Sequence, residues 1–425
     1  MILTYRIFTT ILYPFLFIFL YYRKFLKKED PKRFKEKILI SHFRTLERKK
    51  SKLIWFHAAS VGEFKSIIPI INQLNKKKNL KILVTTTTFS SGNLAKIELR
   101  KFKNVEHRYF PFDVNFLINK FLNKWKPDRI FLVDSEIWPN LILNAKKFKI
   151  PIALLNARLR LKSFNKWMIF SSVAKKIFGI FDLCICSNLE TKKFLKKLEA
   201  KNIYFKGNIK LINYIDYKKI SNINEGILLK KRFWLASSTH KEEDIFCINT
   251  HLKLKKKYKD IITIVAPRHT ERAREIKILC EKFNLNVQIL DKNEIILKNK
   301  EFIIINQFGV LPKYFKYAKS VFIGKSMIKR LENDGGQNPI DAAKLRCKIY
   351  HGPYVYNFEE IYKILQKYNI SKKIKNYNEL CINLISDLKQ PHKKINQMPN
   401  SINNLALKTL NDTIRLINNF IFKNV

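Results

Sequence analysis

Apolar runs of strand length alternate with longer stretches of helical periodicity along most of this chain. The first series, from about Ser51, contains the runs LIWFHAA, KILVTTTT, RIFLVDSE, PIALLNAR and DLCICSN. The second contains FWLASSTH, IITIVAPRH, NVQIL, SVFIG and KIYHGP. Helical stretches such as PIINQLNKKK, INKFLNKW and LILNAKKF lie between strands of the first series. This alternation predicts the α/β class, with two Rossmann-like, doubly wound domains whose parallel sheets carry helices on both faces.

A polar stretch rich in Asn and Lys separates the two series near residue 220. We therefore predict a first Rossmann-like domain over residues 29–215, a linker over 216–230, a second Rossmann-like domain over 231–400 and a closing helix over 401–425. Ligands of open α/β sheets bind beyond the carboxyl ends of the strands. The polar clusters at those ends are candidate site residues, and we expect them to converge on a cleft that the two domains face.

The N-terminal segment has a pattern of its own. Residues 1–22 are almost wholly apolar or aromatic, with Arg6 as the only charge. Four basic residues follow directly: Arg23, Lys24, Lys27 and Lys28. About 20 apolar residues span a bilayer, and a basic flank stays on the cytoplasmic side. We predict that residues 1–28 form a membrane anchor, which either spans the bilayer or lies in its interface; a helix docked on the protein body is the alternative.

Charge and cysteine content narrow the classes of partner. The chain has 425 residues and a formal net charge of +49, from 83 basic and 34 acidic side chains. Such a field attracts nucleic acid, anionic lipid or phosphorylated substrates, although AT-rich coding DNA alone would also raise the Lys content. The six cysteines form no C-x-x-C pair and show no zinc spacing. They predict reduced core residues, not a disulfide framework.

Three carboxylates and one lysine follow strands of the first domain. Glu63 stands where a helix should start after WFHAAS, and it could act as a general base or only complement the helix dipole. Asp134 and Glu136 lie two residues apart after RIFLV, and extended geometry would place both on one face, so that the pKa of at least one should rise. Lys210 in GNIK could be a fixed cation of the site or one of many surface lysines.

The second domain offers cationic and glycine-rich clusters instead. Arg268 in APRH can bind a phosphate bidentately. The motif DGGQNPID, residues 334–341, combines two glycines with a helix start, which suits a phosphate or a nucleotide edge but is also typical of a capped turn. Asp341 on the first helical turn could accept hydrogen bonds from ribose hydroxyls. His240 and His269 lack a second ligand at metal spacing, and we predict no metal.

Taken together, these motifs resemble those of the bacterial 3-deoxy-D-manno-octulosonic acid (Kdo) transferases of lipid A biosynthesis. The matching blocks are WFHAASVGE, TTTTFSSG, HRYFPFD, SEIWPN, NARLRLKS, GNIK, STHKEE, APRH and GGQNPID followed by GPYVYNF. They appear in the family's order over roughly residues 50–360. The resemblance implies a GT-B glycosyltransferase at the cytoplasmic face of the bacterial inner membrane. Its implied reaction moves Kdo from CMP-Kdo to the tetra-acylated lipid A precursor (lipid IVA), releasing CMP, with inversion, no metal and no cofactor.

The resemblance also implies a role for each site residue. The first domain would bind the acceptor and the second the CMP-sugar. Glu63 matches the general base that deprotonates the acceptor hydroxyl, and Asp134 and Lys210 match positions that stabilise the transition state. The predicted CMP-binding residues all lie in the second domain and include the glycines of the DGGQNPID motif. They are Pro267, Arg268, Phe308, Gly309, Val310, Gly335, Gly336, Asn338, Pro339, Ile340 and Asp341.

Some positions depart from the family's pattern, and other functions compete. The family usually has Glu at Asp134 and at Asp341, so each contact loses one methylene of reach and would become water-mediated. Gln337 replaces a usual His, and Val310 a usual acid. The alternatives are another GT-B nucleotide-sugar transferase with a membrane acceptor, a nucleic-acid-binding protein and a non-catalytic membrane scaffold. Lysines spread over nearly every predicted helix, and the lack of a nucleic-acid-binding motif, argue against nucleic acid as a partner.

Overall fold

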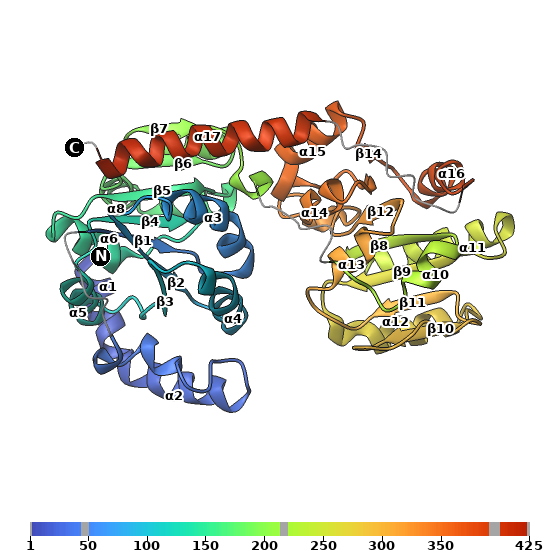
Figure 1. Cartoon of the computed structure of the whole chain (residues 1–425), viewed down its shortest axis with the longest axis horizontal. Coiled ribbons are helices and arrows are strands. Elements are labelled where there is room, and N and C mark those ends of the chain that lie inside the picture. The colour runs from blue at the N-terminus through green and yellow to red at the C-terminus, as the bar shows by residue number, and fades with distance from the viewer. Residues whose placement is uncertain (1, 44–50, 213–219, 391–399, 423–425) are drawn as a thin grey trace. The chain divides into compact units, whose positions relative to one another are not determined.

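Two units make up the fold in a computed structural model, and each is built on one seven-stranded parallel sheet (Figure 1). The structure describes residues 2–43, 51–212, 220–390 and 400–422. The N-terminal unit contains residues 1–214 and 403–425, and the C-terminal unit contains residues 215–402. The predicted linker at 216–219 and the predicted domain ends at 213–215, 391–399 and 423–425 lie outside the described residues.

The sheet of the N-terminal unit has the strand order β3-β2-β1-β4-β5-β6-β7. Its strands are β1 (Lys52–His57), β2 (Leu80–Thr86), β3 (Val105–Tyr109), β4 (Arg129–Val133), β5 (Ile152–Ala157), β6 (Leu183–Cys186) and β7 (Ile203–Phe205). The helices are α1 (Ile2–Ile11), α2 (Tyr13–Phe25), α3 (Val61–Leu74), α4 (Phe89–Glu98), α5 (Asn115–Trp125), α6 (Pro139–Lys147), α7 (Leu161–Ile169), α8 (Ser171–Phe178), α9 (Leu189–Lys197) and α17 (Asn400–Phe422). The strand order reverses between β1 and β4, which defines the topological switch point of this sheet.

The sheet of the C-terminal unit has the order β10-β11-β9-β8-β12-β13-β14, with its switch point between β8 and β12. Its strands are β8 (Phe233–Thr239), β9 (Ile262–Pro267), β10 (Val287–Leu290), β11 (Phe302–Ile305), β12 (Ser320–Ile323), β13 (Lys348–His351) and β14 (Ser371–Lys373). Its helices are α10 (Glu225–Lys230), α11 (Glu243–Lys257), α12 (Ala273–Glu281), α13 (Leu311–Phe315), α14 (Ile340–Lys344), α15 (Glu359–Lys367) and α16 (Tyr377–Asp387). The prediction of the α/β class with two Rossmann-like sheets is confirmed.

The first strand shows why an unbroken apolar run becomes a central strand here. Leu53 and Trp55 of β1 face one core of the unit, whereas Ile54 and Phe56 face the other. All four side chains are at most 1% exposed, because helices cover both faces of the sheet. Successive side chains of a strand point to opposite faces, so a strand buried on both sides needs an apolar residue at every position.

The helix α17 belongs to the N-terminal unit, although the whole C-terminal unit precedes it in the chain. Its residues Ile417, Phe420 and Ile421 are part of the core around α3 and the sheet. The ring of Phe420 lies 5.3 Å from that of Phe131 on β4, and its backbone carbonyl accepts a hydrogen bond from Arg129 Nε at 2.8 Å. The last described helix therefore completes the core that β1 and α3 begin.

Several elements differ from the sequence-based prediction. The strands β3, β7, β11 and β14 were not predicted. The helix α10, Glu225–Lys230, occupies the end of the stretch interpreted as an irregular linker. The strand β4 ends at Val133, so Asp134 lies in a turn and not on an extended strand.

The N-terminal segment forms two helices joined by a bend. No single helix among the described residues is long and apolar enough to cross a membrane, whereas α1 and α2 together would be by length and composition, with a bend of 54° between them. Pro14 lies in the first turn of α2, where its ring fixes the backbone and its missing N–H cannot continue the hydrogen bonding of α1.

Candidate active site

The switch point of the N-terminal sheet gathers the carboxylates predicted from the sequence. The strands β1 and β4 lie side by side there, and their carboxyl ends lead into the segments that carry Glu63, Asp134 and Glu136. This is the edge at which open α/β sheets bind ligands. The structure therefore brings together the three carboxylates singled out in the sequence, Glu63, Asp134 and Glu136.

Glu63 has the capping role that competed with catalysis in the sequence analysis. Ser60 is the N-cap of α3, and its hydroxyl accepts a hydrogen bond from the Glu63 N–H at 3.3 Å. In return Glu63 Oε2 accepts from the N–H groups of Ala59, at 2.7 Å, and Ser60, at 3.4 Å. This reciprocal capping box fixes the carboxylate at the start of the helix.

The surroundings of Glu63 also give it the titration behaviour of a base. Burial raises its pKa from 4.5 to about 7, and the negative charges of Asp134 and Glu136 add to the rise. The hydrogen bond from the Ser60 hydroxyl and the positive charge of Lys210 oppose it. A carboxyl that titrates near neutral pH is suited to general base catalysis, so capping and catalysis are compatible at this residue.

Asp134 holds the predicted cation in place. Its backbone has φ of 61°, in the left-handed region, so the extended geometry expected from the sequence is wrong. This turn directs one carboxylate oxygen to Lys210 Nζ, in an ion pair, and the other to the side-chain amide of Asn156. The side-chain oxygen of the same amide, Asn156 Oδ1, accepts from the Ile209 N–H at 3.0 Å, which ties the GNIK segment to the end of β5. Lys210 is thus a fixed cation of this edge, with its side chain 18% exposed.

The third carboxylate is held by aromatic neighbours. Glu136 Oε2 accepts from Trp138 Nε1 at 2.8 Å and lies 3.3 Å from Nε2 of the fully buried His57. His57 Nδ1 lies 2.9 Å from Thr85 Oγ1, and its ring stacks on Phe110 at a centroid distance of 4.0 Å. The sequence analysis did not single out His57, Asn156 or Trp138, although each lies in a block that carried the resemblance.

The switch point of the C-terminal sheet is organised around a carboxylate that the sequence analysis also missed. Glu243, the first residue of α11, is 0% exposed. Its Oε2 accepts from the N–H groups of His240, at 3.0 Å, and Lys325, at 2.7 Å. Its Oε1 accepts from Ser326 and Met327 at 2.9 and 3.1 Å. Glu243 thereby joins the loop after β8 to the loop after β12.

Glycines allow these loops to approach so closely. A side chain at Gly324 would place its Cβ 2.7 Å from Glu243 Oε2 and 2.7 Å from the Ser238 carbonyl oxygen. The next residue, Lys325, adopts φ of 58° and accepts a hydrogen bond from the Gly336 N–H through its carbonyl. Its ammonium group pairs with Asp334 at 3.0 Å. The predicted DGGQNPID motif is therefore linked to Glu243 through Lys325.

Cationic side chains gather at the neighbouring strand ends. Thr239 pairs with Pro267 between β8 and β9, and the Arg268 N–H donates to the Thr239 carbonyl at 3.0 Å. The rings of His240 and His269 lie 6.0 Å apart. Burial lowers the pKa of His240 to about 4, and the charges of Lys325, His269 and Arg268 lower it further. The exposed guanidinium group of Arg268 and the ammonium group of Lys325 at this sheet edge form a region that favours anions.

The remaining predicted CMP-binding residues lie in two segments of the same unit. Phe308, Gly309 and Val310 follow β11 and lead into α13, with Phe308 68% exposed and Gly309 at φ of 78°. The other segment is continuous from the glycine turn into the five-residue helix α14 and contains Gly335, Gly336, Asn338, Pro339, Ile340 and Asp341. Asn338 Oδ1 accepts from the Ile340 N–H at 3.0 Å, so this asparagine caps its own turn. The predicted contacts of these residues with CMP stay predictions.

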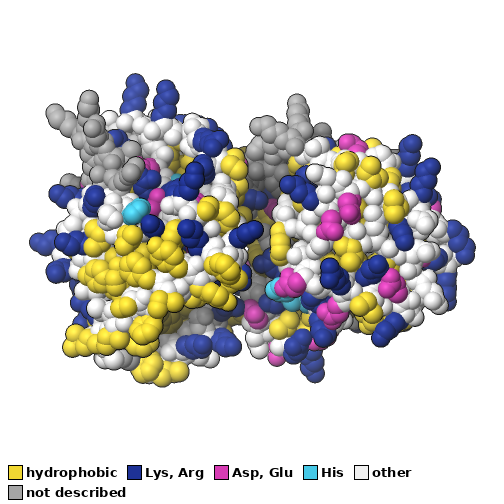
Figure 2. Space-filling model, turned by 90° about the horizontal axis from the view of Figure 1, so that it is seen from below, with side chains coloured by type: hydrophobic (Ala, Val, Ile, Leu, Met, Phe, Trp, Pro, Cys, Tyr) yellow, Lys and Arg dark blue, Asp and Glu magenta, His cyan; other side chains and the backbone are white. Residues whose placement is uncertain are grey.

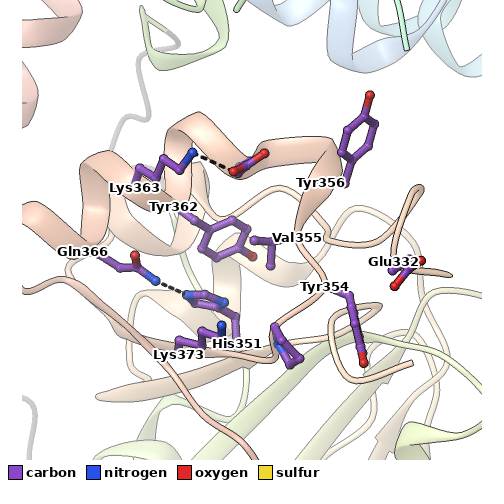
Figure 3. Close-up of a pocket in the computed structure, with 11 residues that line it drawn as sticks. Glu332, His351, Tyr354, Val355, Tyr356, Tyr362, Lys363, Gln366 and Lys373 are labelled. Atoms are coloured by element: carbon purple, nitrogen blue, oxygen red, sulfur yellow. Dashed lines mark hydrogen bonds and ion pairs between the residues drawn. The ribbon is translucent and has the colours of Figure 1, made fainter. Parts of the chain in front are cut away.

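A pocket of about 280 Å³ adjoins the glycine segment (Figure 3). It is lined by Glu332, His351, Pro353, Tyr354, Val355, Tyr356, Glu359, Tyr362, Lys363, Gln366 and Lys373. The Tyr362 hydroxyl donates to the Gln337 carbonyl at 3.1 Å, and Gln366 Nε2 lies 3.0 Å from Nε2 of His351. Four of the lining residues, from Pro353 to Tyr356, belong to the GPYVYNF block that the sequence analysis singled out. Within the described ranges, no group of three or more His, Cys, Asp or Glu side chains could hold a metal ion.

Comparison with known proteins identifies the family. A family model described as 3-deoxy-D-manno-octulosonic-acid transferase (kdotransferase) matches residues 32–213. The probable mitochondrial 3-deoxy-D-manno-octulosonic acid transferase of Arabidopsis thaliana is 32% identical over 334 residues, which cover 76% of this chain and 73% of that protein. The 3-deoxy-D-manno-octulosonic acid transferase of Rickettsia bellii is 30% identical over 394 residues, covering 90% of this chain and 89% of that protein. This chain belongs to the Kdo transferase family. It is therefore a glycosyltransferase, as the motif order implied.

Solved structures support the same architecture for this transferase. The UDP-GlcNAc 2-epimerase from Neisseria meningitidis, bound to UDP-GlcNAc, aligns with a TM-score of 0.58 at 12% identity and covers 88% of this chain and 100% of that chain. A likeness at this identity concerns the fold alone. Together with the two seven-stranded parallel sheets, it confirms the predicted α/β fold of the GT-B type.

Proposed function

We propose that this transferase moves Kdo from CMP-Kdo to the tetra-acylated lipid A precursor with inversion at the anomeric carbon, and that Glu63 is the general base. The observation that carries the proposal is the position of the Glu63 carboxyl, held by its capping hydrogen bonds at the switch point that it shares with Asp134 and Lys210 in a chain of the Kdo transferase family. Burial keeps this carboxyl partly protonated near neutral pH, so its ionised form is a stronger base than an exposed glutamate.

The proposed reaction is a single displacement. Glu63 removes the proton from a sugar hydroxyl of the acceptor, and that oxygen forms the bond to the anomeric carbon of Kdo. The bond between the anomeric carbon and the phosphate oxygen breaks on the opposite side, and CMP leaves with the electron pair. The proton stays on Glu63 until solvent takes it, and the capping hydrogen bonds hold the carboxyl in place throughout.

Lys210 and Asp134 act as a unit in this scheme. The ammonium group of Lys210 offsets negative charge on the leaving phosphate or on the carboxylate of Kdo. Asp134 and Asn156 keep the lysine chain and the GNIK segment in one position, which preorganises the cation before substrate arrives.

In the C-terminal unit, the CMP moiety is proposed to bind at the predicted residues. The guanidinium of Arg268 and the positive potential around His240 and Lys325 favour a phosphate there. The glycine turn at Gly335 and Gly336 lets backbone N–H groups approach a ligand. The residues Phe308–Val310 and 338–341 would then contact the base and the ribose.

The acceptor places the proposed reaction at a membrane. A bisphosphorylated lipid is anionic, and the formal net charge of +49 favours approach to an anionic surface. The basic residues that follow the apolar N-terminal segment favour the cytoplasmic face of the inner membrane, which is the proposed location of this transferase.

A transfer assay tests the proposal. Detergent-purified full-length protein receives CMP-Kdo and tetra-acylated lipid A precursor in the presence of a chelator, and mass spectrometry measures the lipid product. We expect a mass gain of one or more Kdo units with wild type and none with Glu63→Gln, and proton NMR of the product should show the inverted anomer. An excess of UDP-GlcNAc should not compete. Folded wild type that binds CMP but transfers no Kdo would overturn the proposed donor and acceptor.

A further inference from the structure

The N-terminal helices carry one continuous apolar stripe on their outer face. Its members are spaced three or four residues apart and are between 51% and 83% exposed: Leu3, Ile7, Ile11, Phe15, Ile18, Tyr22 and Phe25. This spacing puts them on one side of a helix, and the stripe continues across the bend. In Figure 1, α2 runs along the lower edge of the N-terminal unit, and Figure 2, seen from below, shows hydrophobic side chains gathered on that unit with Lys and Arg around them.

The opposite face of the same helices is docked on the protein. The Tyr5 hydroxyl donates to Asp113 Oδ2 at 3.0 Å, and the Tyr13 hydroxyl donates to the Ile38 carbonyl at 2.9 Å. Further along, Leu20 is 1% exposed in a small core with Phe34 and Ile38. These contacts recur along both helices, so lipid cannot surround the pair while it is docked.

The geometry of the pair also argues against a transmembrane position. At 1.5 Å per residue, the 10 residues of α1 and the 13 residues of α2 are about 15 and 20 Å long, and a hydrocarbon core is about 30 Å thick. The 54° bend prevents the two lengths from adding along one axis. Docked and bent, neither helix reaches across a bilayer.

The charges beside the stripe favour an anionic lipid surface as the partner that covers it. The sequence has no Asp or Glu before Glu29, whereas Lys24, Lys27 and Lys28 lie at the end of α2 and just beyond it. Glu29 itself is 4% exposed and pairs with Lys37 and Arg23. Aromatic and aliphatic side chains beside lysines are typical of helices that lie at the headgroup level of anionic membranes.

We propose that α1 and α2 lie flat in the interface of one anionic leaflet and never cross the bilayer, so that the transferase is a monotopic membrane protein. The choice of lipid as occupant rests on the proposed membrane acceptor. The docked face links this surface to the active site, because Asp113, which binds Tyr5, also accepts from the N–H groups of Asn140 and Leu141 at 2.9 Å. These two residues lie in the first turn of α6, directly after the segment that carries Glu136 and Trp138.

Depth measurement along the stripe tests the proposal. Leu3, Ile11, Ile18 and Phe25 are replaced one at a time by Cys in the full chain and labelled with a nitroxide. All six native cysteines are buried, so the label reports the introduced site. In vesicles of phosphatidylcholine with phosphatidylglycerol, we expect all four labels at one shallow depth, about 5–10 Å below the headgroups. A label at Ile278 of α12, which is 57% exposed, is the control and should show no lipid contact.

Two results would overturn the proposal. Depths that pass from one leaflet through the bilayer centre to the other would establish a transmembrane helix, and labels without lipid contact would assign the stripe to a protein partner. As a second readout, the double variant Ile7→Glu, Ile18→Glu should reduce vesicle binding more than tenfold, while its melting temperature stays within a few degrees because both residues are exposed. Kdo transfer to detergent-dispersed acceptor should survive in this variant, so loss of the surface and failure of the proposed reaction are distinguishable.

Discussion

The two units of this transferase place a glutamate at the same point of the same topology and use it differently. Glu63 follows β1 and Glu243 follows β8, each beside the switch point of its sheet. Glu63 accepts backbone hydrogen bonds from two residues of its own loop. Glu243 accepts four, from two loops that are about 80 residues apart in sequence.

The difference between the two sites shows how their surroundings separate a structural carboxylate from one proposed to act as a base. Burial raises the pKa of both carboxyls. At Glu243 four backbone N–H donors oppose the rise and occupy both oxygens. At Glu63 the charges of Asp134 and Glu136 add to it. The proposed base thus lies where negative charges converge, whereas the structural carboxylate lies where backbone N–H groups converge.

The largest expected effect is the loss of turnover when Glu63 is replaced. Glu63→Gln should lower turnover about 10²–10⁴-fold, because the amide keeps an acceptor oxygen for the capping box but cannot take a proton. The raised pKa of about 7 means that the folded state loses stability as the pH rises through 7 and Glu63 ionises. The melting temperature of the variant, relative to wild type, should therefore be higher at pH 8 than at pH 5. Equal turnover would show that Glu63 only caps α3.

The next effect concerns the fixed cation. Lys210→Met should lower turnover about 10²–10³-fold, since it removes the charge proposed to stabilise the leaving group and leaves Asp134 without its ion-pair partner. The Km for the lipid acceptor should change little, which steady-state kinetics with both substrates would measure. Lys201→Met, at an exposed lysine of the same unit, is the matched control and should behave as wild type.

The third effect concerns the scaffold of the C-terminal unit. Glu243→Ala should lower the free energy of unfolding by about 3 kcal/mol or more, because it leaves four buried N–H groups without their acceptor. Chemical denaturation would measure this loss, and calorimetry should show weaker CMP binding. Glu242→Ala removes only a half-exposed ion pair with Arg330 and should cost less than about 1 kcal/mol. A stable Glu243→Ala protein would contradict the scaffold role.

The smallest effect refines the electrostatics of Glu63. In wild type kcat/KM should fall about tenfold per pH unit below pH 7, as Glu63 becomes protonated. Glu136→Gln removes one of the charges that raise the pKa of Glu63, so this acid limb should move to lower pH while the plateau rate stays close to that of wild type. A limb that does not move would mean that another group controls the profile.

The strands that were not predicted are too short or too polar to produce a clear strand pattern in the sequence. The strands β3, β7 and β14 lie at or beside sheet edges and contain polar residues or only three positions, so they lack a continuous apolar run. The strand β11 is a buried apolar run of four residues, FIII, which is too short for periodicity to distinguish it from a helix. Central strands such as β1 were predictable because burial on both faces demands an apolar residue at every position.

The site residues also fall into two groups: those that a local motif carries and those whose role depends on contacts between distant segments. Glu63, Asp134 and Lys210 were predictable because local motifs carry them, and the structure places Asp134 against Lys210 although 76 residues separate them. The roles of Glu243, His57 and Asn156 depend on contacts between distant loops, which no local spacing reveals. The turn at Asp134 was also hidden, because its φ of 61° is imposed by partners on β5 and in the GNIK segment.

The position of α17 has a consequence for how the chain matures on the ribosome. Most of the N-terminal unit is synthesised first, but Ile417, Phe420 and Ile421 of its core follow the whole C-terminal unit. The C-terminal unit, which is continuous in sequence, can complete its fold while the N-terminal sheet still exposes the apolar surface reserved for α17. The core that supports the Glu63 loop can therefore close only after the whole C-terminal unit has been synthesised, and until then its sheet exposes an apolar surface that is prone to aggregation.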